Sequence, residues 1–193
     1  MRQLLRISLL YTLFTTLLLG LAYPLAITGL AKLFFPAKAN GQLITRNGVV
    51  VGSRLIGQTF SGDAYFHGRP SAAGNGYDAA NSGGSNFGPT SQKLIDRITG
   101  DVATAEKDNH TQSPVPVDLV TASASGLDPD ISVAAAQYQI ERVAHARGLS
   151  VDAVRALVQG HITPRQFGFL GEPRVNVLEL NLALDELARN NKH

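Results

Sequence analysis

The chain contains neither cysteine nor tryptophan. Without cysteine, a disulfide scaffold, a thiol nucleophile and a thiolate zinc site are all excluded. Charged side chains are also scarce. They make up 17% of the 193 residues, whereas soluble domains usually hold roughly 25%. This deficit indicates that part of the chain does not lie in water.

Acidic residues are missing from the first part of the chain. Residues 1–35 contain three basic side chains and no acid, so this segment has a charge of +3. The whole chain has a net charge of +2, so the remaining residues together carry −1. The sequence pI of about 9.0 therefore does not indicate a nucleic-acid-binding face.

Several motifs of ion pumps and metal enzymes are absent. No lysine follows a glycine, which excludes a phosphate-binding loop of the Walker type. The phosphorylated Asp-Lys-Thr-Gly run and the selectivity-filter run Thr-Val-Gly-Tyr-Gly are missing as well. No two histidines have the four-residue spacing of a helical zinc pair; they stand at positions 67, 110, 145, 161 and 193. We therefore expect no metal site and no cofactor that belongs to this chain alone.

One long apolar segment stands near the amino terminus. From Ile7 to Ala31 the chain has 25 residues without a charge. A helix of that length extends about 37 Å, more than the roughly 30 Å of a hydrocarbon core. The run is about twice the apolar part of a secretory signal, so we interpret it as a retained anchor. A first helix with a short basic lead usually inserts with its amino terminus inside. We expect residues 1–35 to be a single-pass transmembrane anchor and residues 36–193 one extracytoplasmic domain.

Local patterns predict the first elements of this domain. Asn47-Gly48 is a favoured two-residue turn between apolar runs, and it predicts a β-hairpin. Residues 61–89 are rich in Gly, Ser and Asn but also contain aromatic side chains, which a flexible linker would lack. We therefore expect a long ordered loop. After it, Thr90 is expected to cap a helix that runs to about Lys107.

The remaining elements alternate between strand and helix patterns. A short buried strand is predicted through Val117, Leu119 and Val120. Three helices follow in the prediction: one from Asp128 as its cap to Gly148, one from Ser150 as its cap to Gln159, and one over 175–187. No clean βαβ repeat is present, so the predicted fold class is α+β.

Two Gly/Ser loops are candidates for binding or chemistry. In the first, Ser82–Thr90, backbone N–H groups next to a helix suit an anion or phosphate, although a tight turn with a helix cap explains the same residues. In the second, residues 121–130, Ser123 and Ser125 lack the Gly-x-Ser-x-Gly elbow, so we reject a serine nucleophile. Three arginines stand in turns, where each could pair within the fold or with a partner: Arg54, Arg69 and Arg174.

The helices expected at 131–147 and 151–159 are arranged like a helix-turn-helix. The second helix offers only Arg155 and Gln159 to read bases. Its other side chains suit packing, so no nucleic-acid partner is expected.

Five long runs, in order and over nearly the whole chain, are similar to one family. With the amino-terminal anchor, the sequence resembles the C subunit of the bacterial Kdp potassium-transporting ATPase. The runs that carry this resemblance are GSRLIGQ (52–58), YFHGRPSA (65–72), YDAANSGGSNFGPTSQKL (77–94), PVPVDLVTASASGLDPDIS (114–132) and LGEPRVNVLELNLALD (170–185). Small departures occur at Phe87, Ser91 and Ala124, where many relatives are expected to have Leu, Asn and Gly.

The resemblance implies a non-catalytic accessory subunit of a high-affinity potassium uptake complex in the bacterial inner membrane. The implied partners are a potassium-channel-like subunit, a P-type ATPase subunit and the lipid bilayer. Family members have been proposed to act as a catalytic chaperone that raises the ATP affinity of the ATPase subunit. ATP would then be shared with that subunit, and the nucleotide contacts that the resemblance implies on this chain are Ser82, Gly83, Gly84 and Ser85.

A domain outside the cytoplasm should not meet cytosolic ATP, so two interpretations remain open. In one, the domain assists nucleotide binding; in the other, it caps the outer mouth of the channel subunit and holds the complex together. Preferential binding to one conformation of the pump would let a distant domain alter ATP affinity. Two alternatives outside the family are a tethered envelope hydrolase and an anion-binding module that works alone through Ser82–Thr90.

Overall fold

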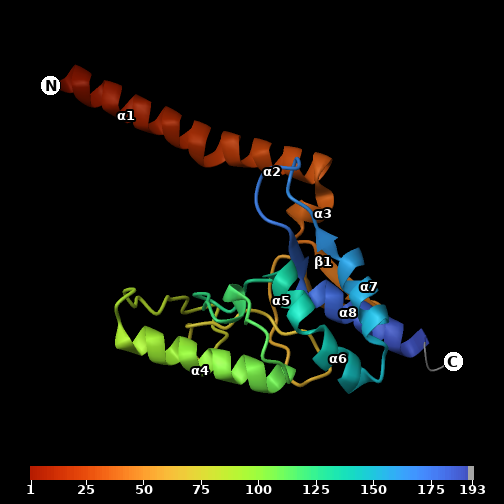
Figure 1. Cartoon of the computed structure of the whole chain (residues 1–193). Helices are drawn as coiled ribbons and strands as arrows, with labels where there is room; N and C mark the ends of the chain where they lie inside the picture. Colours follow the sequence, from red (N-terminus) through yellow and green to blue (C-terminus); the bar gives the residue numbers. More distant parts are fainter. Residues whose placement is uncertain (191–193) are drawn as a thin grey trace. The chain divides into compact units, whose positions relative to one another are not determined.

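The computed structural model describes residues 1–190, so the last three positions of the predicted domain lie outside the described residues. Two units are distinguished by their internal contacts, Met1–Ser53 and Arg54–His193, and each is described by itself (Figure 1). The predicted division into 1–35 and 36–193 stays a prediction.

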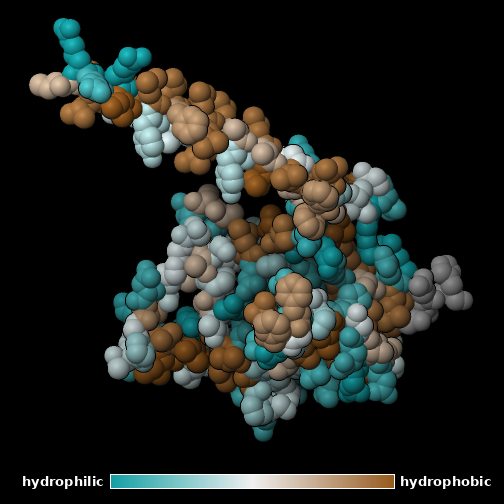
Figure 2. All heavy atoms as spheres, turned by 90° about the horizontal axis from the view of Figure 1, so that it is seen from above, coloured by the Kyte–Doolittle hydropathy of each residue, from teal (hydrophilic) through white to brown (hydrophobic). Residues whose placement is uncertain are grey.

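The first unit consists largely of one long helix. Helix α1 (Arg2–Leu17) continues through a π-helical turn, η1 (Leu18–Ala22), into α2 (Tyr23–Phe34). The turn stands directly before Pro24, whose missing N–H and ring disturb the regular hydrogen-bond pattern of a helix. The helix Arg2–Phe34 is long and apolar enough to cross a membrane. Neither α1 nor α2 has a buried residue, and Figure 2 shows apolar side chains exposed along the helix.

A short helix and a hairpin complete this unit. Helix α3 (Pro36–Ala39) leads to strands β1 (Leu43–Arg46) and β2 (Val49–Ser53), which pair antiparallel. Both turn residues have the left-handed backbone of a type I′ turn, with φ of 50° at Asn47 and 79° at Gly48. The predicted hairpin is confirmed.

The second unit contains a small antiparallel sheet with helices packed against it. Its strands are β3 (Asp130–Ser132), β4 (Ile162–Thr163) and β5 (Arg174–Asn176), with β5 in the centre. The helices of this part are α5 (Val133–Tyr138), α6 (Ile140–Arg147), α7 (Val151–Gly160) and α8 (Val177–Asn190). They enclose an aliphatic core that also contains one aromatic ring from the long loop, Phe66, which is fully buried. This mixture confirms the predicted α+β class.

Helix α4 (Gln92–Asn109) follows the long loop. It begins after Ser91 rather than after the predicted cap Thr90. It ends where His110 adopts a left-handed backbone with φ of 51°.

Two predicted elements differ in the structure. The segment predicted as a buried strand forms a 3-10 turn, η2 (Val117–Leu119). Pro114 and Pro116 stand just before it, and proline lacks the N–H group that a strand uses for pairing. Asp128 does not cap a helix. Instead the chain first forms β3, and Ser132 caps α5 by accepting a hydrogen bond from the Ala135 amide at 3.0 Å.

The other two predicted helices stand where the patterns placed them. Ser150 caps α7 through the Ala153 amide, as predicted. The last helix is confirmed as α8, although the first residues of its predicted range pair as β5 before the helix begins.

Candidate functional site

The structure brings the two predicted Gly/Ser loops together. Ser123, in the second Gly/Ser loop, makes two backbone hydrogen bonds of 2.8 Å to the long loop 61–89. The Ser123 amide donates to the Pro70 carbonyl, and the Ala72 amide donates to the Ser123 carbonyl. Three more backbone bonds extend this seam: Gly57 to Leu127, Asp78 to Ser125, and Gly83 to Ala124. We name the segments 54–89 and 121–130, joined in this way, the loop layer.

Two glycines allow the close approach within the loop layer. A Cβ on Gly126 would stand 2.3 Å from the Gly76 carbonyl oxygen, and Gly126 also has a left-handed backbone with φ of 74°. A Cβ on Gly57 would stand 2.5 Å from the Asp128 carbonyl oxygen. At both positions, any residue other than glycine would displace the neighbouring loop backbone.

The predicted nucleotide contacts Ser82–Ser85 lie on the exposed surface of the loop layer. The Gly83 amide donates to the Ala124 carbonyl at 2.7 Å, so this N–H group is already used within the protein. Just upstream, the Asp78 carboxylate accepts from the amides of Ala80 and Asn81. Hydrogen bonds from the side chain and backbone of Asn81 lower the pKa of Asp78, which places a stable negative charge close to this loop. The arrangement explains an ordered turn more directly than an anion cradle.

The two serines of the second loop bind backbone amides. Ser123 Oγ accepts from the Gly126 amide, and Ser125 Oγ accepts from the Leu127 amide, both at 3.1 Å. These are local turn bonds, in contrast to the serine-to-base bond of a nucleophile. Among the described residues, no three His, Asp or Glu side chains gather in a group that could hold a metal ion.

The three arginines left open by the sequence all pair within the second unit. Arg54 contacts Glu179 at 2.7 Å, and Arg174 contacts Asp130 at 2.9 Å. Arg69 contacts Asp128 at 2.7 Å and also donates to the Thr121 carbonyl. Asp128, predicted as a helix cap, therefore ties the two segments of the loop layer together.

A buried polar network, not found from the sequence, fixes the long loop on the helices. Arg142 of α6 is only 4% exposed, and its guanidinium donates mainly to neutral groups. The Nε atom reaches Asn109 Oδ1 at 3.0 Å, and one terminal nitrogen reaches the carbonyls of Asp63 and Tyr65 at 2.7 and 3.0 Å. The other terminal nitrogen reaches Gln139 Oε1 at 2.8 Å.

Two side-chain amides continue this network by binding the backbone of the long loop. Asn181 of α8 accepts from the Phe66 amide at 2.8 Å and donates to the Phe66 carbonyl at 2.9 Å. Gln139 binds the amide and carbonyl of His67 in the same way, at 2.8 and 3.1 Å. Each side-chain amide thus bonds both the N–H and the C=O group of one loop residue, as the backbone of a neighbouring β-strand would. The only sequence signal for these roles is a polar residue within an otherwise apolar helical stretch.

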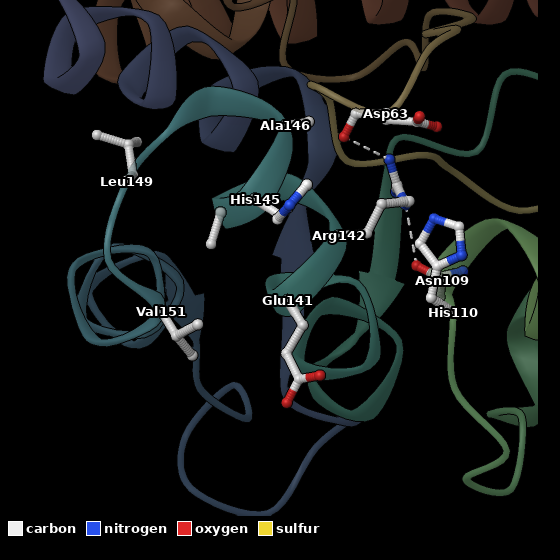
Figure 3. Close-up of a pocket in the computed structure, with 10 residues that line it drawn as sticks. Asp63, Asn109, His110, Glu141, Arg142, His145, Ala146, Leu149 and Val151 are labelled. Carbon is white, nitrogen blue, oxygen red and sulfur yellow. Dashed lines mark hydrogen bonds between the residues drawn. The ribbon is translucent and has the colours of Figure 1, made fainter.

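The network borders an open pocket of about 540 Å³ between α4, α6 and the start of α7 (Figure 3). Figure 3 shows the Arg142 guanidinium held between Asp63 and Asn109, with Glu141 and His145 on the same helix. Nearby, burial first and the charge of Arg142 second lower the pKa of His67 below its ordinary value of 6.5. The His67 ring hydrogen-bonds the Gly62 carbonyl at 2.9 Å, so the imidazole serves as a structural bridge within the long loop.

These features define a class of protein. It is an α+β domain that follows one candidate membrane span, and its loop layer is held together by backbone hydrogen bonds, ion pairs and close-fitting glycines. In the part of the chain that the structure describes, its polar side chains build that scaffold.

Comparison with known proteins places the chain within this class. Residues 5–186 match the family described as K⁺-transporting ATPase, c chain (KdpC). Proteins named potassium-transporting ATPase KdpC subunit are similar to it throughout. That of Koribacter versatilis is 61% identical over 178 residues, which cover 92% of both chains. That of Acidobacterium capsulatum is 61% identical over 183 residues, covering 95% of this chain and 98% of the relative. The chain belongs to the KdpC family.

Proposed function

We propose that this chain is a non-catalytic accessory subunit that assembles and stabilises a potassium-transporting ATPase complex. Its partners are then a potassium-channel-like subunit and a P-type ATPase subunit, together with the lipid bilayer. The observation that carries the proposal is the family match over residues 5–186, which includes most of the candidate span and most of the α+β domain. The hydrogen bonds of Ser123 and Ser125, which serve local turns, favour this role over that of an independent hydrolase.

The proposed location is the bacterial inner membrane, with a cytoplasmic amino terminus and the domain outside the cytoplasm. The basic lead before the apolar helix supports this orientation. In that position, the domain would act at the outer mouth of the channel-like subunit.

The proposed catalytic chaperone effect on ATP affinity then acts through the pump. A subunit that binds one conformation of its partner more tightly shifts the partner toward that conformation and changes its affinity at a distant site. The used Gly83 amide and the nearby Asp78 carboxylate support this route over direct nucleotide contact. The direct contact at Ser82–Ser85 stays a prediction.

The test is to purify the complex with and without this chain and to measure potassium-stimulated ATP hydrolysis. The expected result is loss of stable assembly and of potassium-stimulated activity when the chain is missing. Unchanged assembly and activity would reject the accessory role.

A matched pair of variants separates the two routes to ATP affinity. Replacement of Ser82 and Ser85 by alanine removes the exposed hydroxyls of the proposed contact, and replacement of Thr111 and Ser113 by alanine serves as a control on a distant exposed turn. We expect both variants to keep the wild-type KM for ATP. A raised KM in the first variant alone would establish direct nucleotide contact.

A further inference from the structure

The hairpin between β4 and β5 has an unusual tip. Residues 164–172 are all exposed, yet the tip is ordered by its own bonds. The amides of Gln166 and Leu170 each donate to the other residue's carbonyl at 2.9 Å. At the base of the tip, Arg165 pairs with Glu172.

Three apolar side chains project from this tip into solvent. Phe167 is 78% exposed, Phe169 is 70% exposed and Leu170 is 47% exposed. Phe167 also has a left-handed backbone with φ of 54°, which is strained for a bulky side chain. Exposed apolar groups held in a strained and ordered turn indicate a contact surface, since neither the core nor solvation explains them.

The chemistry of the tip suits a medium without water. Hydrogen bonds within the tip satisfy the amides of Gln166, Gly168, Phe169 and Leu170, so they need no solvent. The ion pair at the base leaves the tip without net charge. Amides satisfied in this way can enter an apolar phase at a lower cost than free amides can.

The bilayer is the apolar phase within reach. Helix α2 ends at Phe34, and Leu43 pairs with Ser53, so the hairpin returns the chain to its own starting point. Only residues 35–42 then extend the tether, which spans about 29 Å at most. A unit of this size has a radius of gyration of about 14 Å. The tether therefore keeps the start of the second unit, at Arg54, within reach of the membrane surface.

We propose that the tip formed by Phe167, Phe169 and Leu170 inserts into the interfacial region of the lipid bilayer as a second membrane contact. This inference rests on the anchored location stated under the proposed function. Recognition depends on apolar burial and not on charge, so the tip should bind zwitterionic and anionic membranes alike.

The absence of tryptophan from the chain provides a direct test. The full chain carrying Phe169→Trp is reconstituted into phosphatidylcholine vesicles with brominated acyl chains. The same change at another exposed ring, Phe87→Trp in the loop before α4, is the matched control. We expect lipid quenching and a blue-shifted emission for Phe169→Trp, whereas Phe87→Trp should stay accessible to aqueous acrylamide. Addition of phosphatidylglycerol should leave the lipid quenching unchanged.

Four other results of this experiment would each overturn the proposal. Acrylamide access at both positions would leave the tip in water, and equal lipid quenching at both would remove its special role. Quenching that requires phosphatidylglycerol would indicate recognition by charge. A blue shift that appears only in the assembled complex, without lipid quenching, would assign the tip to a pocket on a partner protein. Flotation of the same vesicles reports the anchor separately, so its failure is distinguished from that of the tip.

Discussion

At the scale of single residues, Arg142 has the most demanding position in the second unit. Its guanidinium is nearly buried and donates its hydrogen bonds to carbonyl and amide oxygens, not to a carboxylate. Such a charge is tolerated because several donors are satisfied at once. Arg142 therefore determines whether the long loop stays attached to α6.

We expect Arg142→Gln to lower the free energy of unfolding by roughly 2–4 kcal/mol, because several buried acceptors lose their donor. Urea unfolding of the full chain in mild detergent, followed by circular dichroism, measures this change. Arg155→Gln removes a guanidinium from an exposed pair with Asp152 and should change the value by about 0.5 kcal/mol or less. Equal effects of both variants would contradict the role of the network.

His67 makes the stability of the second unit depend on pH. Burial and the charge of Arg142 lower its pKa in the folded state, despite the opposing influence of the Gly62 hydrogen bond and of Asp108 and Asp63. Because the unfolded chain binds the proton more readily, stability should be complete above pH 6.5 and fall as the pH decreases below that value. The loss between pH 7 and pH 5 should be smaller in His67→Gln, with pH 8 as the reference for the packing cost of the variant. An identical loss in both proteins would contradict this assignment.

The strained backbone of Phe167 leads to a third expectation. Asparagine adopts the left-handed region more readily than phenylalanine. Phe167→Asn should therefore raise the free energy of unfolding by about 0.5–1 kcal/mol in detergent while it removes an apolar group from the tip. A lowered stability in the same urea experiment would show that the ring packs within the fold.

At the scale of elements, the loop layer depends on backbone seams between segments that are distant in sequence. Gly126 stands at the closest crossing, where a Cβ would meet the Gly76 carbonyl. This contact turns a stretch rich in small residues into an ordered surface.

Gly126→Ala combines a left-handed backbone with a steric clash, so it should cost about 2–4 kcal/mol in unfolding free energy. Gly100→Ala is the control, because a Cβ there meets nothing within 4 Å inside helix α4. The control should gain up to about 1 kcal/mol from helix propensity. Chemical unfolding of both variants measures these changes. An unchanged free energy of unfolding in Gly126→Ala would contradict the close contact with the Gly76 carbonyl.

Local signals made some elements predictable and left others out. The hairpin at Asn47-Gly48 and the cap at Ser150 were found because turn chemistry and capping involve residues only a few positions apart. The strands β3 and β5 were missed because each has three residues, too few for an alternating pattern. The role of Arg142 was also missed, since its acceptors at Asp63 and Tyr65 lie 79 and 77 positions away.

For the candidate site, too, the sequence indicated which segments matter but not which contacts they make. Composition singled out both Gly/Ser loops, but only the fold shows that the Gly83 amide is bound to Ala124. Pairing partners for Arg54, Arg69 and Arg174 likewise depend on tertiary contacts that periodicity does not contain.

At the scale of the whole molecule, an apolar helix of 33 residues and a nearly neutral domain have separate roles. The helix is the candidate membrane span, and the domain would supply the surface for the proposed partners. The central claim is the proposed position of the domain outside the cytoplasm, since that position would make any effect on ATP hydrolysis indirect.

The side of the membrane on which the domain lies tests this claim most directly, and the absence of cysteine makes the measurement clean. Val117→Cys places one thiol on the domain at a side chain that is 74% exposed, and Gln3→Cys places one at the amino terminus. A membrane-impermeant maleimide should label Val117→Cys in intact spheroplasts and Gln3→Cys only in inverted vesicles. Labelling of Val117→Cys only in inverted vesicles would contradict the account.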